Sequence, residues 1–324
     1  MPKAIILRNY GGPEELKLED ISTPEPGAGE LRLRVTAAGI NFHDVYVRSG
    51  LYRTLALPGI PGIEVVGVVE AHGEGVTAPA LGTRVACVTG KYGGYSQAAI
   101  VPAALALPLP DDVSDETAAA ATLKGLTACM LLSACYPVAA GTTALVHAAA
   151  GGVGQILTRW AKAKGATVIA TVGSEAKAQI ARDCGADHVI LYREEDFVAR
   201  VKSLTDGRGV DVAYDAVGKD TFAGSLACLG MLGHLVNYGQ ASGPVPPLDV
   251  SSLAAKSNTL ARPIIFHYVA DPARRTAMAR ELFAAMSAGV VVPRIDLTLP
   301  LGEAAAAHRA LEGRGLAGSV ILKP

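Results

Sequence analysis

The stretch HAAAGGVGQI, from His147 to Ile156, joins two segments of different periodicity. The preceding TALVH is apolar and short, which predicts a buried strand that ends at His147. The following VGQILTRWAKAKG carries apolar residues at helical spacing and ends in a glycine, which predicts a helix that starts at Val153. A glycine-rich turn between a buried strand and a helix is typical of a phosphate-binding loop.

The turn departs at one position from the dinucleotide-binding pattern G-x-G-x-x-G, because Ala149 stands where the first glycine is usual. Gly151 still permits a pyrophosphate to approach the backbone, and Gly154 still permits close contact between helix and strand. A merely structural turn is the alternative, and the strand and helix on either side favour a cofactor. The residues expected to contact it here are Ala150, Gly151, Gly152, Val153 and Gly154.

Strand-like and helix-like segments alternate after this turn up to about residue 260, which predicts a parallel sheet covered on both faces. The expected strands are ATVIATVG, DHVILY, VDVAYDAVG and HLVNYG, and the expected helices include SEAKAQIARDCG and DFVARVKSLT. The first ~120 residues instead show short β-rich segments punctuated by Gly and Pro, typical of an irregular antiparallel domain. A helix from Pro272 to Gly289 and a last strand from Ser319 to Leu322 are expected to return to that domain.

The fold class is therefore α/β, with a Rossmann-type doubly wound sheet beside a mostly-β domain. We expect residues 125–264 to form the nucleotide-binding domain. We expect residues 1–124 and 265–324 to form the substrate domain.

Composition excludes several functional classes. The formal net charge of −1 in 324 residues gives no electrostatic case for nucleic acid or an anionic membrane as partner. The five cysteines form no CxxC pair, so the sequence predicts neither a disulfide framework nor a cysteine-based zinc site. The N-terminus lacks a signal-like apolar core, and we expect no membrane-spanning segment and a cytoplasmic location.

The end of the second strand distinguishes NAD from NADP. NAD-binding units carry an acid there for the ribose 2′-OH, but here the strand ends in Gly173 and Ser174, and Glu175 lies one step into the next helix. Lys177 follows within a turn, and Tyr192-Arg193 ends the third strand at the same edge. The missing acid and nearby cations favour a 2′-phosphate, hence NADPH, with Gly173, Ser174, Lys177 and Tyr192 as contacts. A solvated helix lysine is the alternative for Lys177.

At these residues the chain resembles the zinc-free quinone oxidoreductases of the medium-chain dehydrogenase/reductase superfamily. The resemblance runs from about residue 30 to 220 and includes the C-terminal LEGRGLAGSVILKP. It rests on the combination of AGINFHDVYVRSGLY, PGIEVVGVVEAHGEGV, LKGLTA, VHAAAGGVGQI, TVGSEAKA, YREEDF and YDAVGKDTF. It implies a GroES-like fold for the mostly-β domain.

The resemblance also implies that no metal binds. Asn41, Ile63 and Leu123 stand where zinc-dependent relatives carry cysteine, histidine and cysteine, and they cannot make a tetrahedral zinc site. His43 and His72 have no partner at ligand spacing in the sequence.

For the acceptor, the resemblance implies a quinone bound between the domains in a cleft lined by Asn41, Tyr46 and Tyr52. The two tyrosines can donate an O–H to the quinone oxygens and set their rings against it; packing in the core is the alternative for both. We interpret Asp44 and Arg48, in the same motif, as a local ion pair that holds the loop. Fold and family together imply further cofactor contacts from Thr127, Gly218, Asn237, Gly239 and Arg314.

The apolar stretch RPIIFHY (262–268) is interpreted as an edge strand at a dimer contact. The resemblance also implies a homodimer through the nucleotide-binding domain. Two alternatives to quinone reduction stay open. One is an NADPH-dependent enone or 2-alkenal reductase, which needs the same hydride and a similar donor to oxygen. The other is a non-catalytic NADPH-binding protein of the crystallin or RNA-binding kind, against which the near-neutral charge argues. The physiological acceptor and the number of electrons per step do not follow from the sequence.

Overall fold

The computed structural model describes residues 1–313 and 315–324. The chain divides into two compact units. Unit 1 comprises Met1–Leu123, Leu282–Ser287 and Val292–Pro324, and unit 2 comprises Lys124–Glu281 and Ala288–Val291. Residues 265–281 thus group with the sheet-containing unit 2, whereas the sequence placed them in the substrate domain. The domain limits at residues 124 and 265 stay proposals.

Unit 2 is built on a parallel six-stranded sheet in the order β10-β9-β8-β11-β12-β13. Its strands are β8 (Thr143–His147), β9 (Thr167–Val172), β10 (His188–Leu191), β11 (Val210–Asp215), β12 (Leu229–Asn237) and β13 (Thr259–Ala261). Successive strands from β8 to β10 are added toward one edge of the sheet, and those from β11 to β13 toward the other edge. The topological switch point therefore lies between β8 and β11. Ligands of such sheets bind at the carboxyl ends beside that point. The α/β class and the parallel sheet predicted from the sequence are confirmed.

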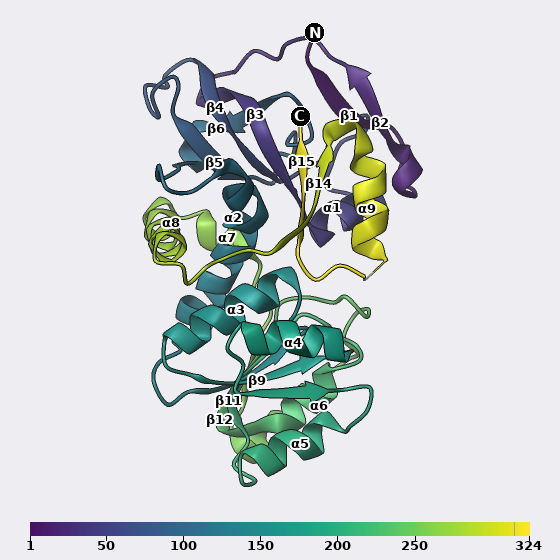
Figure 1. The fold of residues 1–324 in the computed structure, drawn as a ribbon, viewed down its shortest axis with the longest axis vertical. Coiled ribbons are helices and arrows are strands. Elements are labelled where there is room, and N and C mark those ends of the chain that lie inside the picture. Colours follow the sequence, from purple (N-terminus) through teal and green to yellow (C-terminus); the bar gives the residue numbers. More distant parts are fainter. Residues whose placement is uncertain (314) are drawn as a thin grey trace. The chain divides into compact units, whose positions relative to one another are not determined.

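Helices cover both faces of this sheet (Figure 1), α3 and α4 on one side and α5 and α6 on the other. They are α3 (Gly152–Ala163), α4 (Glu175–Asp183), α5 (Phe197–Leu204) and α6 (Phe222–Cys228). Because both faces are covered, the strands are mostly apolar, and Leu145, Ile169 and Ala213 are fully or almost fully buried.

The prediction of an edge strand at residues 262–268 is wrong. The edge strand β13 ends at Ala261, and residues Ile265–Val269 form a short helix, α7. Pro263 explains the change, because a proline has no N–H to donate to a strand ladder. The chain continues from there into the long helix α8 (Pro272–Ser287), as predicted.

Unit 1 is a mostly antiparallel seven-stranded sheet in the order β14-β15-β3-β4-β5-β7, with β6 also paired to β3. The C-terminal strand β15 pairs antiparallel with β3, as the predicted return requires, and parallel with β14. A two-stranded sheet of β1 and β2 lies beside it. The elements of unit 1 are β1 (Lys3–Leu7), β2 (Leu16–Asp20), β3 (Glu30–Ile40), α1 (Phe42–Arg48), β4 (Glu64–His72), β5 (Arg84–Val88), β6 (Ala98–Pro102), β7 (Ala106–Pro108), β14 (Ile295–Pro300), α9 (Ala304–Glu312) and β15 (Ser319–Lys323).

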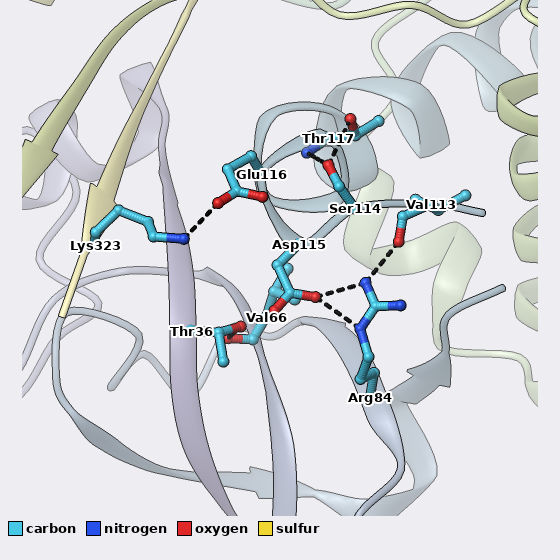
Figure 2. A network of polar contacts seen from close by, with 9 residues as sticks. All are labelled: Thr36, Val66, Arg84, Val113, Ser114, Asp115, Glu116, Thr117 and Lys323. Carbon is cyan, nitrogen blue, oxygen red and sulfur yellow. Dashed lines mark hydrogen bonds and ion pairs between the residues drawn. The ribbon is translucent and has the colours of Figure 1, made fainter. Parts of the chain in front are cut away.

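The helix α2 (Asp115–Cys129) starts in a polar network drawn in Figure 2. Ser114 Oγ accepts from the backbone N–H of Thr117 at 3.1 Å, which caps the first turn. The guanidinium of Arg84, on β5, donates to Asp115 Oδ1 at 2.6 and 2.9 Å and to the Val113 carbonyl. This network ties the start of the helix to the sheet of unit 1.

The helix continues as a π-helical segment (Met130–Cys135). The whole stretch of Asp115–Cys135 is, by length and composition alone, apolar enough to cross a membrane, unlike our expectation for any segment. However, 72% of its most apolar window is buried inside the protein, as in the core helix of a globular fold.

Candidate functional site

The glycine loop has the geometry that a phosphate-binding turn needs. The helix α3 begins at Gly152, one residue earlier than predicted, with Gly151 as its extended N-cap residue. A Cβ on Gly154 would lie 2.3 Å from the Ala148 carbonyl oxygen, so only glycine lets the helix approach the loop this closely. The left-handed residue is Ala148, with φ of 51°, and Ala149 is not in that region. The usual first glycine is therefore dispensable at Ala149.

The N-terminus of α3 presents the positive end of the helix dipole and the N–H groups of its first turn. The side chain of Gln155 donates from Nε2 to the Ala150 carbonyl at 2.8 Å and fixes the loop from inside. This backbone can therefore bind a pyrophosphate without a cationic side chain.

The carboxyl end of β9 forms a second cradle. A Cβ on Gly173 would lie 2.7 Å from the Tyr192 hydroxyl and 3.4 Å from Arg193 Nε, so both side chains reach over this glycine. Ser174 is the N-cap residue of α4, and Lys177 lies in the first turn of that helix. Glu175, the nearest acid in the sequence, is paired with Arg182 at 2.6 Å. The structure thus groups hydroxyl and cationic side chains here and directs the acid to another partner.

The ends of β11 and β12 carry three more of the predicted contacts. Gly218 follows β11 with φ of 88°, a conformation that favours glycine. Asn237 is the last residue of β12, and its Nδ2 donates to the Gly239 carbonyl at 3.1 Å. A Cβ on Gly239 would lie 2.5 Å from the Ala216 carbonyl, so the two loops touch through backbone.

The remaining two predicted cofactor contacts lie elsewhere. Thr127 lies within α2 rather than at a strand end. Arg314 lies outside the described residues.

The predicted acceptor residues gather around α1 in unit 1. Asn41 is the buried N-cap residue of that helix, and the rings of Tyr46 and Tyr52 meet edge to face at 5.2 Å between centroids. His43, on the same helix as Tyr46, sets its ring 5.6 Å from that of Tyr52 and its Nε2 3.3 Å from the Tyr92 hydroxyl. His43 and Tyr46 of the helix thus form, with Tyr52 and Tyr92, an aromatic cluster suited to a flat acceptor.

Glu64 contacts the predicted site residue Asn41, although the sequence did not single it out. It is fully buried, and its carboxylate accepts from Asn41 Nδ2 at 2.9 Å and from the Leu123 backbone N–H at 2.6 Å. It thus connects two of the positions where zinc-dependent relatives carry ligands, and the third, Ile63, precedes it. The available signal was an acid inside the apolar run PGIEVVGVV.

The prediction of a local ion pair between Asp44 and Arg48 is wrong. Asp44 Oδ2 accepts from the Asn41 backbone N–H at 2.8 Å, which closes the start of α1. Arg48 instead donates two bonds to Glu312 on α9, at 2.7 and 2.8 Å, and one to the Gly11 carbonyl. A spacing of four residues would allow the pair on a helix, but Asp44 is held at the start of α1 and Arg48 is held by Glu312 instead. Burial raises the pKa of Asp44 to about 7, partly offset by its bond from Asn41.

Unit 1 also holds a fully buried histidine, His308. Its Nε2 lies 3.2 Å from the Tyr95 hydroxyl and its Nδ1 3.4 Å from Arg48 Nη1. Burial, and then the charge of Arg48, lowers the pKa of His308 to about 3. The folded protein thus keeps this imidazole neutral.

We expect His308 to make the protein acid-sensitive. Its pKa is lower when folded than when unfolded, so its contribution is complete above about pH 6.5 and is lost as the pH falls towards 3. Between pH 7 and 4.5 the loss amounts to about 2.5 kcal/mol. Urea unfolding at both pH values should therefore show a smaller drop for H308Q than for the wild type. H267Q, at an exposed histidine, should keep the wild-type drop, and an H308Q drop equal to it would refute the assignment.

Among residues 1–313 and 315–324, no group of three or more His, Cys, Asp or Glu side chains is arranged to hold a metal ion. The Asn41 amide nitrogen is bonded to Glu64, and Ile63 and Leu123 offer no ligand atom. The residues at these three positions do not fit a tetrahedral zinc ion.

Two family models match the chain, the alcohol dehydrogenase GroES-like domain over residues 27–111 and the zinc-binding dehydrogenase over 152–283. A quinone oxidoreductase of Pseudomonas aeruginosa is 44% identical over all of both chains. A 2-haloacrylate reductase of a Burkholderia species is 40% identical over 100% of this chain and 99% of its own. The crystal structure of Escherichia coli quinone oxidoreductase complexed with NADPH superposes with a TM-score of 0.96 at 41% identity, over 99% of this chain and 100% of that one. The chain therefore belongs to the quinone oxidoreductases of the medium-chain dehydrogenase/reductase superfamily.

Proposed function

We propose that this protein is an NADPH-dependent quinone oxidoreductase that transfers hydride without a metal. The observation that carries the proposal is the cradle at Gly173, where a hydroxyl and a guanidinium reach over bare backbone and the nearby acid is occupied by Arg182. The full-length relatives named quinone oxidoreductase supply the reaction class.

The residues present fit NADPH. The glycine loop at 150–154 suits the pyrophosphate, because a side chain at Gly154 would collide with backbone. The cradle of Gly173, Ser174, Lys177 and Tyr192 suits a 2′-phosphate, which takes hydrogen bonds from hydroxyl and cationic groups. When bound, the nicotinamide supplies a hydride. The chain's own task is then to hold the cofactor and to orient an acceptor.

We assign the acceptor to the aromatic cluster at α1 and the segment that follows it. Tyr46 and Tyr52 each offer a ring face and a hydroxyl donor to a flat, electron-poor molecule. Glu64 holds the Asn41 amide in one orientation, since it accepts from Nδ2. A quinone needs little acid catalysis, because its reduced oxygens are weak bases, so hydrogen-bond donors suffice. Binding of the quinone between the two domains stays part of the proposal.

The second candidate is reduction of an activated alkene, which the 2-haloacrylate reductase among the relatives favours. Steady-state rates with 1,4-benzoquinone and with 2-hexenal separate the two, because only the alkene needs a proton at carbon. We expect kcat/KM for benzoquinone to exceed that for 2-hexenal at least about tenfold, or about 1.4 kcal/mol. The reverse order would make the alkene reductase the better assignment.

Charge reversal at Lys177 should alter cofactor selectivity. We expect K177E to weaken NADPH binding by about 10- to 100-fold, because a charge-assisted bond becomes a repulsion. NADH, which lacks the 2′-phosphate, should bind within about twofold of the wild type. The matched control is K202E, the same charge change on the exposed face of α5. Equal losses for both cofactors, measured by fluorescence titration, would remove Lys177 from the 2′-phosphate site.

Three further features complete the proposal. We propose a homodimer through the nucleotide-binding domain, a cytoplasmic location, and a cofactor contact from Thr127. Size-exclusion chromatography with light scattering tests the first.

A further inference from the structure

A chain of buried polar side chains runs beneath the cofactor loops of unit 2. It comprises Thr171 on β9, His147 on β8, Ser225 and Thr221 at α6, and Asp215 on β11. All five are at most 9% exposed. Each cofactor loop begins within three residues of one of these side chains. The glycine loop follows His147, the Gly173 cradle follows Thr171, and the Gly218 turn follows Asp215. None of these five residues is expected to touch the cofactor.

Asp215 organises the turn after β11. Its Oδ1 accepts from the backbone N–H groups of Val217 at 2.8 Å and Gly218 at 3.0 Å, and from Thr221 Oγ1 at 2.8 Å. Its backbone carbonyl accepts from the N–H of Tyr238 at 2.8 Å, after β12. One residue therefore fixes two cofactor loops, through its side chain and its main chain.

Ser225 and His147 connect Asp215, on β11, to the strands β8 and β9 across the switch point. Ser225 Oγ lies 3.2 Å from Asp215 Oδ2 and 2.8 Å from the Thr221 carbonyl oxygen, the two acceptors within reach of its single proton, and 3.0 Å from His147 Nε2. His147 Nδ1 lies 2.8 Å from Thr171 Oγ1. Every atom is satisfied if Thr171 donates to Nδ1 of a neutral imidazole and Nε2–H donates to Ser225. Burial lowers the pKa of His147 to about 4, which agrees with that neutral form.

We propose that Asp215, Ser225 and His147 are positioning residues. They hold the glycine loop, the Gly173 cradle and the Gly218 turn in the relative positions that NADPH binding requires. The inference rests on the proposed cofactor. Bonds that end on backbone N–H groups and at strand termini control where the loop atoms lie, and small displacements of binding groups are costly.

The test compares two aspartates on the same strand. Asp211 also accepts from a backbone N–H, that of Thr143 at 2.7 Å, but lies four residues earlier, at the opposite end of β11. We expect D215A to raise the NADPH Kd at least about tenfold and D211A to leave it within twofold. D215N, which keeps an acceptor oxygen, should recover most of the affinity. Hydrogen exchange of the apo-proteins should rise in residues 148–154 for D215A and not for D211A.

A folded D215A with wild-type Kd and exchange would overturn the inference, as would an equal loss in D211A. If D215A does not fold, S225A decides, because it keeps the bonds to Val217 and Gly218 but removes the connection to His147. Faster exchange in 148–154 then supports the proposal, and unchanged exchange contradicts it. Failure of the wild type to bind NADPH would instead contradict the proposed function. Hydrogen exchange of residues 148–154 in the variants would still report whether Asp215 orders the glycine loop.

Discussion

Replacing Gly154 with alanine is expected to lower NADPH affinity by at least about 100-fold, or about 2.7 kcal/mol. The added Cβ would lie 2.3 Å from the Ala148 carbonyl oxygen and 2.8 Å from the Ala149 Cα. Both are backbone atoms, so no side-chain rotation relieves the collision and the loop itself must move. Calorimetric titration with NADPH measures the loss.

Two other glycines supply controls for G154A. Nothing lies within 4 Å of a Cβ built on Gly90, so G90A should leave affinity and stability unchanged. A Cβ on Gly151 meets only the Ala148 carbonyl oxygen, at 3.2 Å. G151A should therefore keep most of the melting temperature but weaken NADPH binding, since that glycine faces the expected pyrophosphate. Wild-type NADPH affinity in a folded G154A would contradict the assignment of the loop.

Glu312→Ala is expected to cost about 3 kcal/mol of unfolding free energy, near the lower limit for a broken buried ion pair. Arg48 has a side chain only 3% exposed, and the substitution leaves its guanidinium charge without a carboxylate. Glu312 itself is 35% exposed, so water can replace part of what is lost. Urea unfolding at pH 7 gives the value.

The matched control for E312A is E70A. Glu70 pairs with Arg34 at 3.4 Å, with the side chains 39% and 57% exposed, and more distantly with Arg32, which keeps Glu25 as a second partner. Its loss should therefore cost no more than about 1 kcal/mol. Equal costs for the two substitutions would show that burial of Arg48 contributes nothing.

The sequence predicted the sheet of unit 2 because its signals are local. The strand TALVH, the glycines after it and the following helix lie within about two dozen residues, and each obeys its own periodicity. The grouping at the end of β9 also followed, since carboxyl ends of parallel strands meet at one edge. Tyr192 and Arg193 indeed lie against Gly173.

Two of the points that the sequence did not give concern contacts between residues far apart in the chain, and one is local. Arg48 and Glu312 are separated by 264 positions, so the shorter-range pair with Asp44 was the natural but wrong interpretation. Glu64 binds Leu123 across 59 positions, and no periodicity marks such a bond. At 262–268 the apolar composition suggested a strand, although Pro263 ends the ladder and a helix follows.

The most direct test of the central claim is NADPH and NADH oxidation by the purified protein with 1,4-benzoquinone, measured in a buffer containing EDTA. We predict quinone-dependent oxidation with kcat/KM for NADPH at least about tenfold above that for NADH, because the Gly173 cradle favours a 2′-phosphate. Activity should be unchanged by the chelator. Equal or better use of NADH would contradict the NADPH assignment, and no quinone-dependent oxidation with either cofactor would contradict the proposed reaction.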